Sequence, residues 1–305
     1  MINTTALKLV STKPANIADF ETVNVVSSQT TNTVVHQTTD VAPTRTVDTV
    51  KTIDTVSCEM PDLVSAVLTK GSQNIKIEYS DQANLVPHAV ENLALRMLKI
   101  DPEIRDFLKS LRALFASKKE TFHYTFNKIS KEGKAELIDI CKNLCGVITE
   151  VSSDYNAISG KIVLTQKAQT FINGQYMEIA VRKIVSDMLA KLEKKHGKSF
   201  KLYANTKVVT KDGKLKNEFD LIVENVTDSI LYVIEVKSGK NFYDFDKLAR
   251  IGREYKIVPN RLLLVQNYLT TEHMETIEYF CEYYCANLEQ NNLEQKLTTM
   301  IENDL

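Results

Sequence analysis

Four polar residues in the second half of the chain have side chains of the types that metal-dependent hydrolysis of a phosphodiester uses. They are Glu178, Asp220, Glu235 and Lys237, and their spacing is E–x(41)–D–x(14)–E–x–K. Carboxylate oxygens are the ligands that hard cations such as Mg²⁺ prefer, and a bound cation makes water a nucleophile at neutral pH. A lysine can stabilise the charge that develops on a phosphate. The pattern therefore predicts a metal-dependent phosphodiesterase site that uses Mg²⁺ or Mn²⁺.

Two of these residues interrupt the apolar segment Ile230–Lys237, which is typical of a central strand covered on both faces. Glu235 and Lys237 are two positions apart, so they point to the same side. A structural ion pair is the alternative interpretation, but it does not account for Asp220 in the apolar segment 218–224. If the two strands pair as a hairpin, Asp220 and Glu235 converge.

The fourth residue, Glu178, lies near the start of a helix predicted over residues 173–195. It is in register with the apolar stripe of that helix, which consists of Val181, Val185, Met188 and Leu192. A carboxylate on a buried face is unfavourable unless something pairs with it. The alternative is a glutamate that favours the helix start through the helix dipole, and without the other three residues that alternative would be preferred.

The elements around these residues are predicted from the periodicity of apolar residues. They are helix 173–195, strands 200–210, 218–224 and 230–237, helix 244–255, strand 261–266 and a closing helix 271–285. Residues 211–214 read as the turn of a hairpin. The order is thus helix, three strands, helix, strand.

This order and the four residues resemble the PD-(D/E)xK nuclease superfamily, whose core is αβββαβ. The resemblance covers about 120 residues, and Phe219 stands where the family name has proline. It implies a restriction-endonuclease-like fold for residues 169–305 and endonuclease activity on DNA or RNA. The alternative is a catalytically inactive nucleic-acid-binding or regulatory protein that keeps the same fold.

The resemblance also implies a role for each residue. Asp220 and Glu235 would bind the metal directly, and the carbonyl of Val236 would be a third ligand. Glu178 would reach the metal directly or through water. Lys237 would orient the attacking water and stabilise charge on the phosphate.

Several short motifs are similar to those of CRISPR-associated nucleases fused to a CARF domain, which act in antiviral defence. Residues 171–178 resemble the F-x-x-G-x-W-L-E helix start of that group, with Tyr and Met in place of Trp and Leu. Residues 217–220 resemble its N-E-x-D strand, and residues 235–239 its E-x-K-x-G motif. Residues 246–248 resemble the K-L helix that follows. The resemblance implies a Rossmann-type sensor domain, a winged-helix-like linker and a nuclease, in that order.

The first 168 residues are compatible with this order. Strands are predicted at 7–10, 22–26, 52–58 and 74–79, with helices at 61–70 and 86–100. Their alternation predicts a reduced Rossmann-like (CARF-like) layer over residues 1–100, and a partly disordered Thr-rich leader is the alternative. For residues 101–168, helices 102–115 and 131–144 and a hairpin of 147–151 with 161–165 predict a winged-helix-like connector, which binds DNA or only joins domains.

Partners are suggested by the same part of the chain and by its charges. A homodimer joined through residues 1–100 is expected, because symmetric dimers are the commonest oligomers. The loop 80–84 lacks the glycine- and threonine-rich turn with a lysine that sensor domains have, so binding of a cyclic oligoadenylate is expected to be weak or absent. Nine lysines against two acids in residues 191–216 suggest a phosphate-binding surface, although a solvated helix end and hairpin would look the same. Lys240 and Arg253 are further candidates for phosphate contact.

The remaining signals are mainly negative. The chain has 305 residues, a net charge of −1 and five cysteines, an odd number that argues against a disulfide framework. Cys141 with Cys145, and Cys281 with Cys285, are CxxxC pairs predicted on helices, where a metal site is less expected than burial as small apolar residues. The chain shows no signal peptide and no apolar run long enough for a bilayer, so a cytoplasmic protein without membrane contact is expected.

Overall fold

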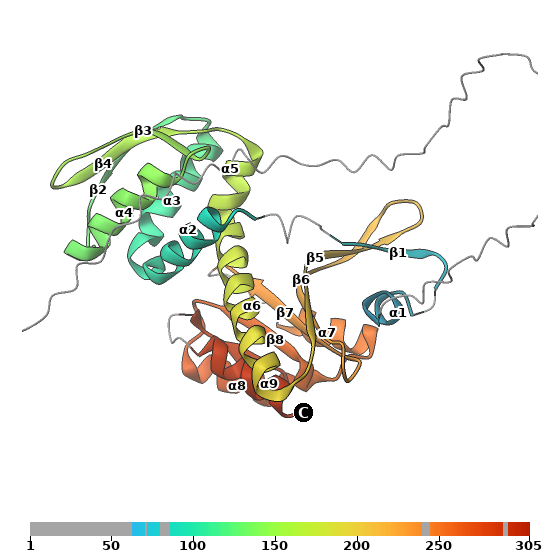
Figure 1. Cartoon of the computed structure of the whole chain (residues 1–305). Coiled ribbons are helices and arrows are strands. Elements are labelled where there is room, and N and C mark those ends of the chain that lie inside the picture. The colour runs from blue at the N-terminus through green and yellow to red at the C-terminus, as the bar shows by residue number, and fades with distance from the viewer. Residues whose placement is uncertain (1–62, 71, 80–85, 240–244, 289–291) are drawn as a thin grey trace, which may run out of the picture.

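A computed structural model describes residues 63–70, 72–79, 86–239, 245–288 and 292–305 (Figure 1). The strands predicted at 7–10, 22–26 and 52–58, the loop 80–84 and Lys240 lie outside the described residues.

The described chain is a mixed α/β structure built on a six-stranded sheet of order β1-β5-β6-β7-β8-β9. The strands are β1 (Ile75–Glu78), β5 (Phe200–Thr210), β6 (Leu215–Asn225), β7 (Ile230–Lys237), β8 (Leu262–Gln266) and β9 (Tyr284–Ala286). Pairing is antiparallel from β1 to β7 and parallel from β7 to β9. The three long strands β5, β6 and β7 were each predicted from their apolar pattern.

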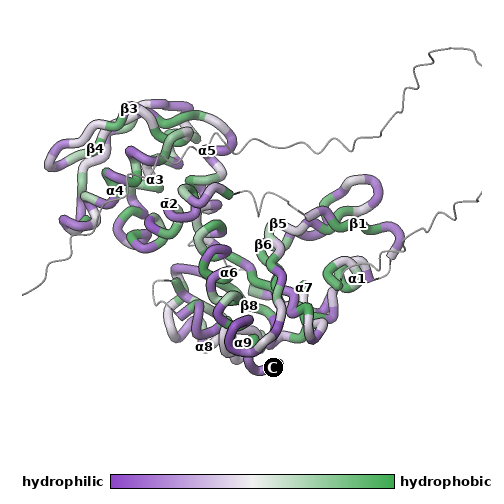
Figure 2. Tube along the Cα trace, viewed as in Figure 1, coloured by the Kyte–Doolittle hydropathy of each residue, from purple (hydrophilic) through white to green (hydrophobic). Residues whose placement is uncertain are grey.

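Helices cover both faces of this sheet and create two hydrophobic clusters (Figure 1). On one face lie α6 (Tyr176–His196) and α9 (Leu293–Glu302), and on the other lie α1 (Leu63–Thr69), α7 (Asp246–Tyr255) and α8 (Thr271–Cys281). Burial of β7 and β8 on both faces explains their continuous apolar sequence. Figure 2 shows this as hydrophobic segments at the centre of the sheet, while the tip of the β5–β6 hairpin is hydrophilic. The order α6-β5-β6-β7-α7-β8 is the predicted αβββαβ order.

A second unit of helices and strands precedes α6. It contains α2 (His88–Lys99), α3 (Asp101–Ser117), α4 (Lys131–Asn143) and α5 (Gln166–Thr170), with β2 (Thr121–Thr125), β3 (Ile148–Ser153) and β4 (Ala157–Ile162) in a sheet of order β2-β4-β3. The predicted hairpin is present as β3 and β4, but β4 begins at Ala157 rather than at residue 161, and β2 was not predicted. Ser130 caps α4, since its hydroxyl accepts a hydrogen bond from the Gly133 N–H at 2.9 Å. A single helix lies between β2 and β3, and the winged-helix-like assignment stays a prediction.

The described part of residues 1–100 differs from the predicted layer. The strand predicted at 74–79 is β1, which pairs antiparallel with β5 and extends the six-stranded sheet, with Ile75 opposite Thr210. Helix α1 packs on the same sheet, because Val64 and Leu68 are buried against its second cluster. These elements therefore belong to the large sheet rather than to a layer of their own. Val90, Leu93 and Met97 on α2 are buried in the core that α2 shares with α6.

The end of the chain also departs from the prediction of one closing helix over 271–285. Helix α8 stops at Cys281, because Glu282 adopts a left-handed conformation with φ 59°. The chain then forms β9 beside β8 and continues into α9, which was not predicted. Cys285 thus lies on a strand, and Cys145 follows the end of α4. Neither CxxxC pair shares one helix face, and burial raises the pKa values of Cys141 and Cys285.

None of the helices in the described ranges has the length and apolar character needed to cross a membrane.

Attachment of α1 to the large sheet can be tested by mutation. Leu68→Ala is expected to lower the free energy of unfolding by about 2–4 kcal/mol, because deletion of a fully buried leucine side chain leaves a cavity. Urea unfolding followed by tyrosine fluorescence measures the change. Ala66→Ser, on the exposed side of the same helix, should stay within about 0.5 kcal/mol of the parent. An unchanged unfolding midpoint for Leu68→Ala would show that α1 is not part of this folding unit.

Candidate active site

The hairpin of β6 and β7 brings two of the predicted acids together. Leu221 lies opposite Ile234 in the antiparallel register, so the next position on each strand places Asp220 beside Glu235. The Val236 N–H donates a hydrogen bond to Asp220 Oδ2 at 2.7 Å, which fixes that carboxylate across the end of β7. The two acids therefore meet where the β6–β7 ladder ends.

Glu235 is the most buried member of the group, with 2% of its surface exposed. Its Oε1 atom accepts from Lys237 and, at 2.7 Å, from Lys247 at the start of α7. Its other oxygen, Oε2, is buried and has no hydrogen-bond partner among the described residues. A buried, unpaired carboxylate oxygen is strongly unfavourable, so the site has an unfilled demand for a donor or a cation.

Lys237 is the main counter-charge within the site. Its Nζ contacts Glu235 and lies 3.9 Å from Asp220 Oδ2. Burial works to lower the pKa of Lys237, but attraction by Asp220, Glu235 and Glu178 outweighs it, and the pKa lies above its ordinary value. Lys237 is therefore positively charged at neutral pH.

The carboxylates destabilise one another's charge. Burial, together with repulsion by Glu235 and Glu178, raises the pKa of Asp220 to about 7, although Lys237 partly offsets the effect. The pKa of Glu178 is also raised, mainly because the side chain is buried. Attraction by Lys237 opposes this shift, and repulsion by Glu218 and Glu235 adds to it. Glu178 is thus within electrostatic range of the other site residues. Three half-buried or buried acids against few cations form a cluster that a further positive charge would stabilise.

The chain enters the Glu178 helix through an unusual turn. Residues Phe171–Gln175 form a kinked turn before α6, in which Gly174 has a non-helical backbone with φ 155°. A Cβ atom at Gly174 would lie 2.2 Å from Ser238 Oγ, and that hydroxyl donates to the Asn173 carbonyl at 3.0 Å. The glycine of the F-x-x-G motif is therefore required for the start of α6 to approach the segment that follows Lys237.

The structure adds two polar residues that the sequence interpretation did not place in the site. Gln266 ends β8 opposite Lys237, and its amide donates to the Gly239 carbonyl at 2.8 Å. Its Oε1 atom is buried without a hydrogen-bond partner among the described residues. A polar residue directly after four apolar ones was the available signal. Lys247 belongs to the segment 246–248, which resembles the K-L helix, but the sequence assigned no function to this lysine.

The chemical types of the donor atoms suit a hard divalent cation, but their positions in this structure do not yet form a complete ligand set. Carboxylate oxygens, one of them buried and unpaired, are suitable ligands for Mg²⁺ or Mn²⁺. Within the described part of the chain, however, no three His, Cys, Asp or Glu side chains are grouped closely enough to hold a metal ion. Lys237 Nζ lies near both Glu235 Oε1 and Asp220 Oδ2, so a cation that bridged these two oxygens would have to displace it.

The lysine-rich segment 191–216 is not one uninterrupted basic surface. Lys191 and Lys195 on α6 form ion pairs with Glu294 and Glu302 of α9. Lysines 198, 207, 214 and 216 also pair with acids, which are Asp228, Glu218, Asp212 and Glu254. Exposed pairs of this kind contribute at most about 1 kcal/mol each, so a phosphate could still compete for these lysines.

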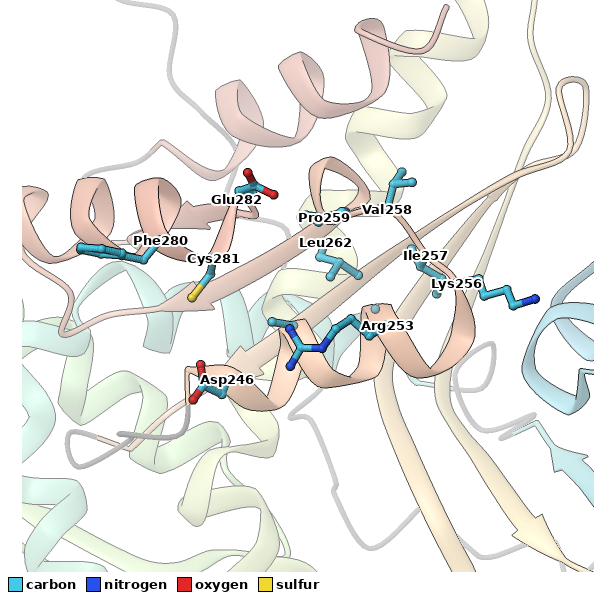
Figure 3. A pocket seen from close by; sticks show the side chains of 12 residues that line it. Asp246, Arg253, Lys256, Ile257, Val258, Pro259, Leu262, Phe280, Cys281 and Glu282 are labelled. Atoms are coloured by element: carbon cyan, nitrogen blue, oxygen red, sulfur yellow. The ribbon is translucent and has the colours of Figure 1, made fainter.

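Arg253 lies elsewhere. It lines a pocket of about 460 Å³ between α7 and the end of α8, where its guanidinium is near Cys281 (Figure 3). The acids of the site do not line this pocket, so the structure does not place Arg253 among the residues that surround Glu235.

Comparisons with known proteins identify the fold. No protein-family model matches the chain, and no curated protein matches it significantly. The chain is similar to the crystal structure of protein VC1899 from Vibrio cholerae, with 16% identity and a TM-score of 0.50 over 78% of this chain and 60% of that one. It is also similar to Can2 from Sulfobacillus thermosulfidooxidans in complex with cyclic tetra-adenylate, with 16% identity and a TM-score of 0.47 over 75% and 56% of the two chains. The likeness to VC1899 shows a shared fold, and this chain spans about 60% of the length of that protein.

The close approach at Gly174 gives a testable prediction. Gly174→Ala is expected to lower the free energy of unfolding by roughly 2–4 kcal/mol, because the backbone strain of about 1–3 kcal/mol adds to a lost hydrogen bond of about 1 kcal/mol. Urea unfolding measures the change. Gly197→Ala is the matched control, since that residue also has positive φ but nothing within 4 Å of a Cβ atom, and its cost should be about 1 kcal/mol. Equal losses in the two variants would contradict the contact with Ser238.

Proposed function

We propose that this protein is a metal-dependent endonuclease that hydrolyses phosphodiester bonds of DNA or RNA. The observation that carries the proposal is the juxtaposition of Glu235 and Lys237 at the end of β7 with Asp220 in the middle of β6. One buried oxygen of Glu235 has no hydrogen-bond partner among the described residues. The order of these residues and their elements is that of the PD-(D/E)xK nucleases, which supports membership of that superfamily.

The residues divide the work as follows. Asp220, Glu235 and the Val236 carbonyl would hold Mg²⁺ or Mn²⁺, and Glu178 of α6 would reach the metal directly or through water. The cation would lower the pKa of its bound water and shield charge on the phosphate. Lys237 is held in its charged form by the acids around it, so it acts as a donor that orients the attacking water and stabilises charge on the phosphate.

Recognition of the nucleic acid would rest mainly on its phosphates. Lysines of residues 191–216 would contact the backbone in place of their exposed acidic partners, and such binding weakens as salt is added. Regulation by the N-terminal residues in antiviral defence, and a homodimer joined through residues 1–100, complete the proposal. Weak or absent binding of cyclic oligoadenylates remains the expectation.

A second candidate function is favoured by one specific observation. Both Lys237 and Lys247 contact Glu235 Oε1, an arrangement that also suits a permanently neutralised acid in an inactive nucleic-acid-binding protein. Incubation of plasmid DNA, single-stranded DNA and RNA with Mn²⁺ distinguishes the two functions. Cleavage supports the nuclease, whereas salt-sensitive binding without any cleavage supports the second candidate.

The first prediction from the proposed function concerns Glu235. Glu235→Gln is expected to abolish cleavage and Mn²⁺ binding, because the amide removes the negative charge that holds the cation. Asp220→Asn should have the same effect. Cleavage of labelled nucleic acid and isothermal titration with Mn²⁺ measure the two properties.

Glu224→Gln is the matched control for Glu235→Gln. Glu224 is a glutamate on β6 with 5% of its surface exposed, and it accepts a hydrogen bond from Tyr203 at 2.6 Å. It is not part of the site, so its replacement should leave cleavage and Mn²⁺ affinity close to those of the parent. Parental cleavage by Glu235→Gln would show that the site is wrongly assigned.

The second prediction separates the role of Lys237 from metal binding. Lys237→Ala is expected to lower the cleavage rate about 100-fold or more, since it removes a preorganised charge beside the phosphate. Its Mn²⁺ affinity should not fall, because a cation that competed with the metal for Glu235 has been removed. Glu178→Ala should lower the cleavage rate less than Lys237→Ala does, and the rate of this variant should depend more strongly on the Mn²⁺ concentration than that of the parent. Equal loss of Mn²⁺ affinity in Lys237→Ala and Glu178→Ala would be inconsistent with this division.

A further inference from the structure

A second buried carboxylate, Asp101, lies outside the acid site. It is the first residue of α3 and only 2% of its surface is exposed. Three side chains donate to it, namely Tyr176 Oη at 2.5 Å, Arg105 Nε at 3.0 Å and Asn267 Nδ2 at 3.0 Å. Arg105 comes from α3 itself, whereas the other two are 75 and 166 residues away along the chain.

The two distant donors are directly connected to the acid site. Tyr176 is two residues before Glu178, in the first turn of α6. Asn267 follows Gln266, whose neighbour across the parallel ladder is Lys237. One carboxylate therefore binds both the segment that presents Glu178 and the segment that ends beside Lys237.

Helix α3 holds the same two segments through other contacts. Arg112 donates from Nε and Nη2 to the Ile172 carbonyl at 3.2 and 3.0 Å, in the kinked turn before α6. The guanidinium of Arg105 lies 4.3 Å from the centre of the Tyr268 ring, directly after Asn267. The turn at 171–175 is thus held on one side by α3 and contacts Ser238 on the other.

Stability alone does not account for this arrangement. A buried ionic group is often no more stabilising than apolar residues of the same volume, because its desolvation is costly. The Oδ1 atom of Asn267 is buried without a hydrogen-bond partner among the described residues, so Asp101 is the group that orients this side chain. The hydrogen bonds to Asp101 are directional, so they fix the positions of the side chains that donate them.

We propose that Asp101 is a positioning residue that sets the location of Glu178 and Gln266 relative to Glu235 and Lys237. This inference rests on the nuclease function proposed above. Asp101 acts through Tyr176 on one side of the site and through Asn267 on the other. The unit that contains α3 thereby controls the geometry of the site without contributing a group to the reaction.

Asp101→Asn tests the proposal, because it keeps the size of the side chain but cannot accept from all three donors. With plasmid DNA, single-stranded DNA or RNA, whichever the parent protein cleaves fastest, kcat is expected to fall about 10- to 100-fold, as a misplacement of roughly 1 Å in an active site does. KM should stay within about twofold of the parent, since the phosphate-binding lysines are unchanged. Tyr176→Phe should lower kcat less, and the double variant should be no worse than Asp101→Asn alone.

The matched control is Asp139→Asn in the same unit, an exposed aspartate that pairs with Arg96 at 2.6 Å. Its kinetics should equal those of the parent. All rates are compared well below the melting temperature of each variant, so that loss of stability does not lower kcat. Unchanged kcat in folded Asp101→Asn would overturn the proposal and leave Asp101 a structural residue.

Amide hydrogen exchange in the metal-free full chain provides a readout that does not need cleavage. Asp101→Asn should increase exchange at least about tenfold in both 171–178 and 266–268, because both segments lose their common partner. An increase confined to α3 would overturn the proposal even if activity fell. A parent protein that cleaves nothing would end the nuclease proposal, and the coupling by Asp101 would then be decided by exchange alone.

Discussion

Burial of the Glu235 carboxylate at the end of a central strand is the constraint around which the rest of the site is organised. Strand β7 is covered by helices on both faces, so this charge has little access to water. Its neighbours must therefore supply positive charge, as Lys237 and Lys247 do. The nearby acid Asp220 has a raised pKa, because it is itself buried and because Glu235 repels its negative charge.

The sheet and the helices fix the positions of the residues that surround the Glu235 carboxylate. The antiparallel register of β6 and β7 sets Asp220 beside Glu235, and the parallel register of β7 and β8 sets Gln266 beside Lys237. The middle of β6 and the ends of β7 and β8 provide fixed positions, while α6 and α7 pack on opposite faces of the sheet. The substrate, if it is a nucleic acid as proposed, would therefore meet a site whose parts are carried by rigid elements rather than by loops.

The sequence predicted those parts whose signal is local. Strands β6 and β7 and helix α6 have long, regular apolar patterns, and acids that interrupt such patterns are conspicuous. The partners of those acids were harder to find, because Gln266 is one polar residue at the end of a short strand. Strand β1 was assigned to another layer, since a four-residue strand does not reveal which sheet it joins. Cys285 was placed on a helix because a left-handed residue such as Glu282 has no distinctive sequence.

The edges of the large sheet have a consequence for how copies of this protein could associate. The edge strands in the described structure, β1 and β9, have four and three residues, so each presents few unpaired backbone N–H and C=O groups. Short edges discourage the addition of a further strand, and with it the growth of a continuous sheet between molecules or the formation of fibres. Within the described part of the chain, contacts between copies would then use helix faces and side chains, whose chemistry can be changed by single substitutions without altering the sheet.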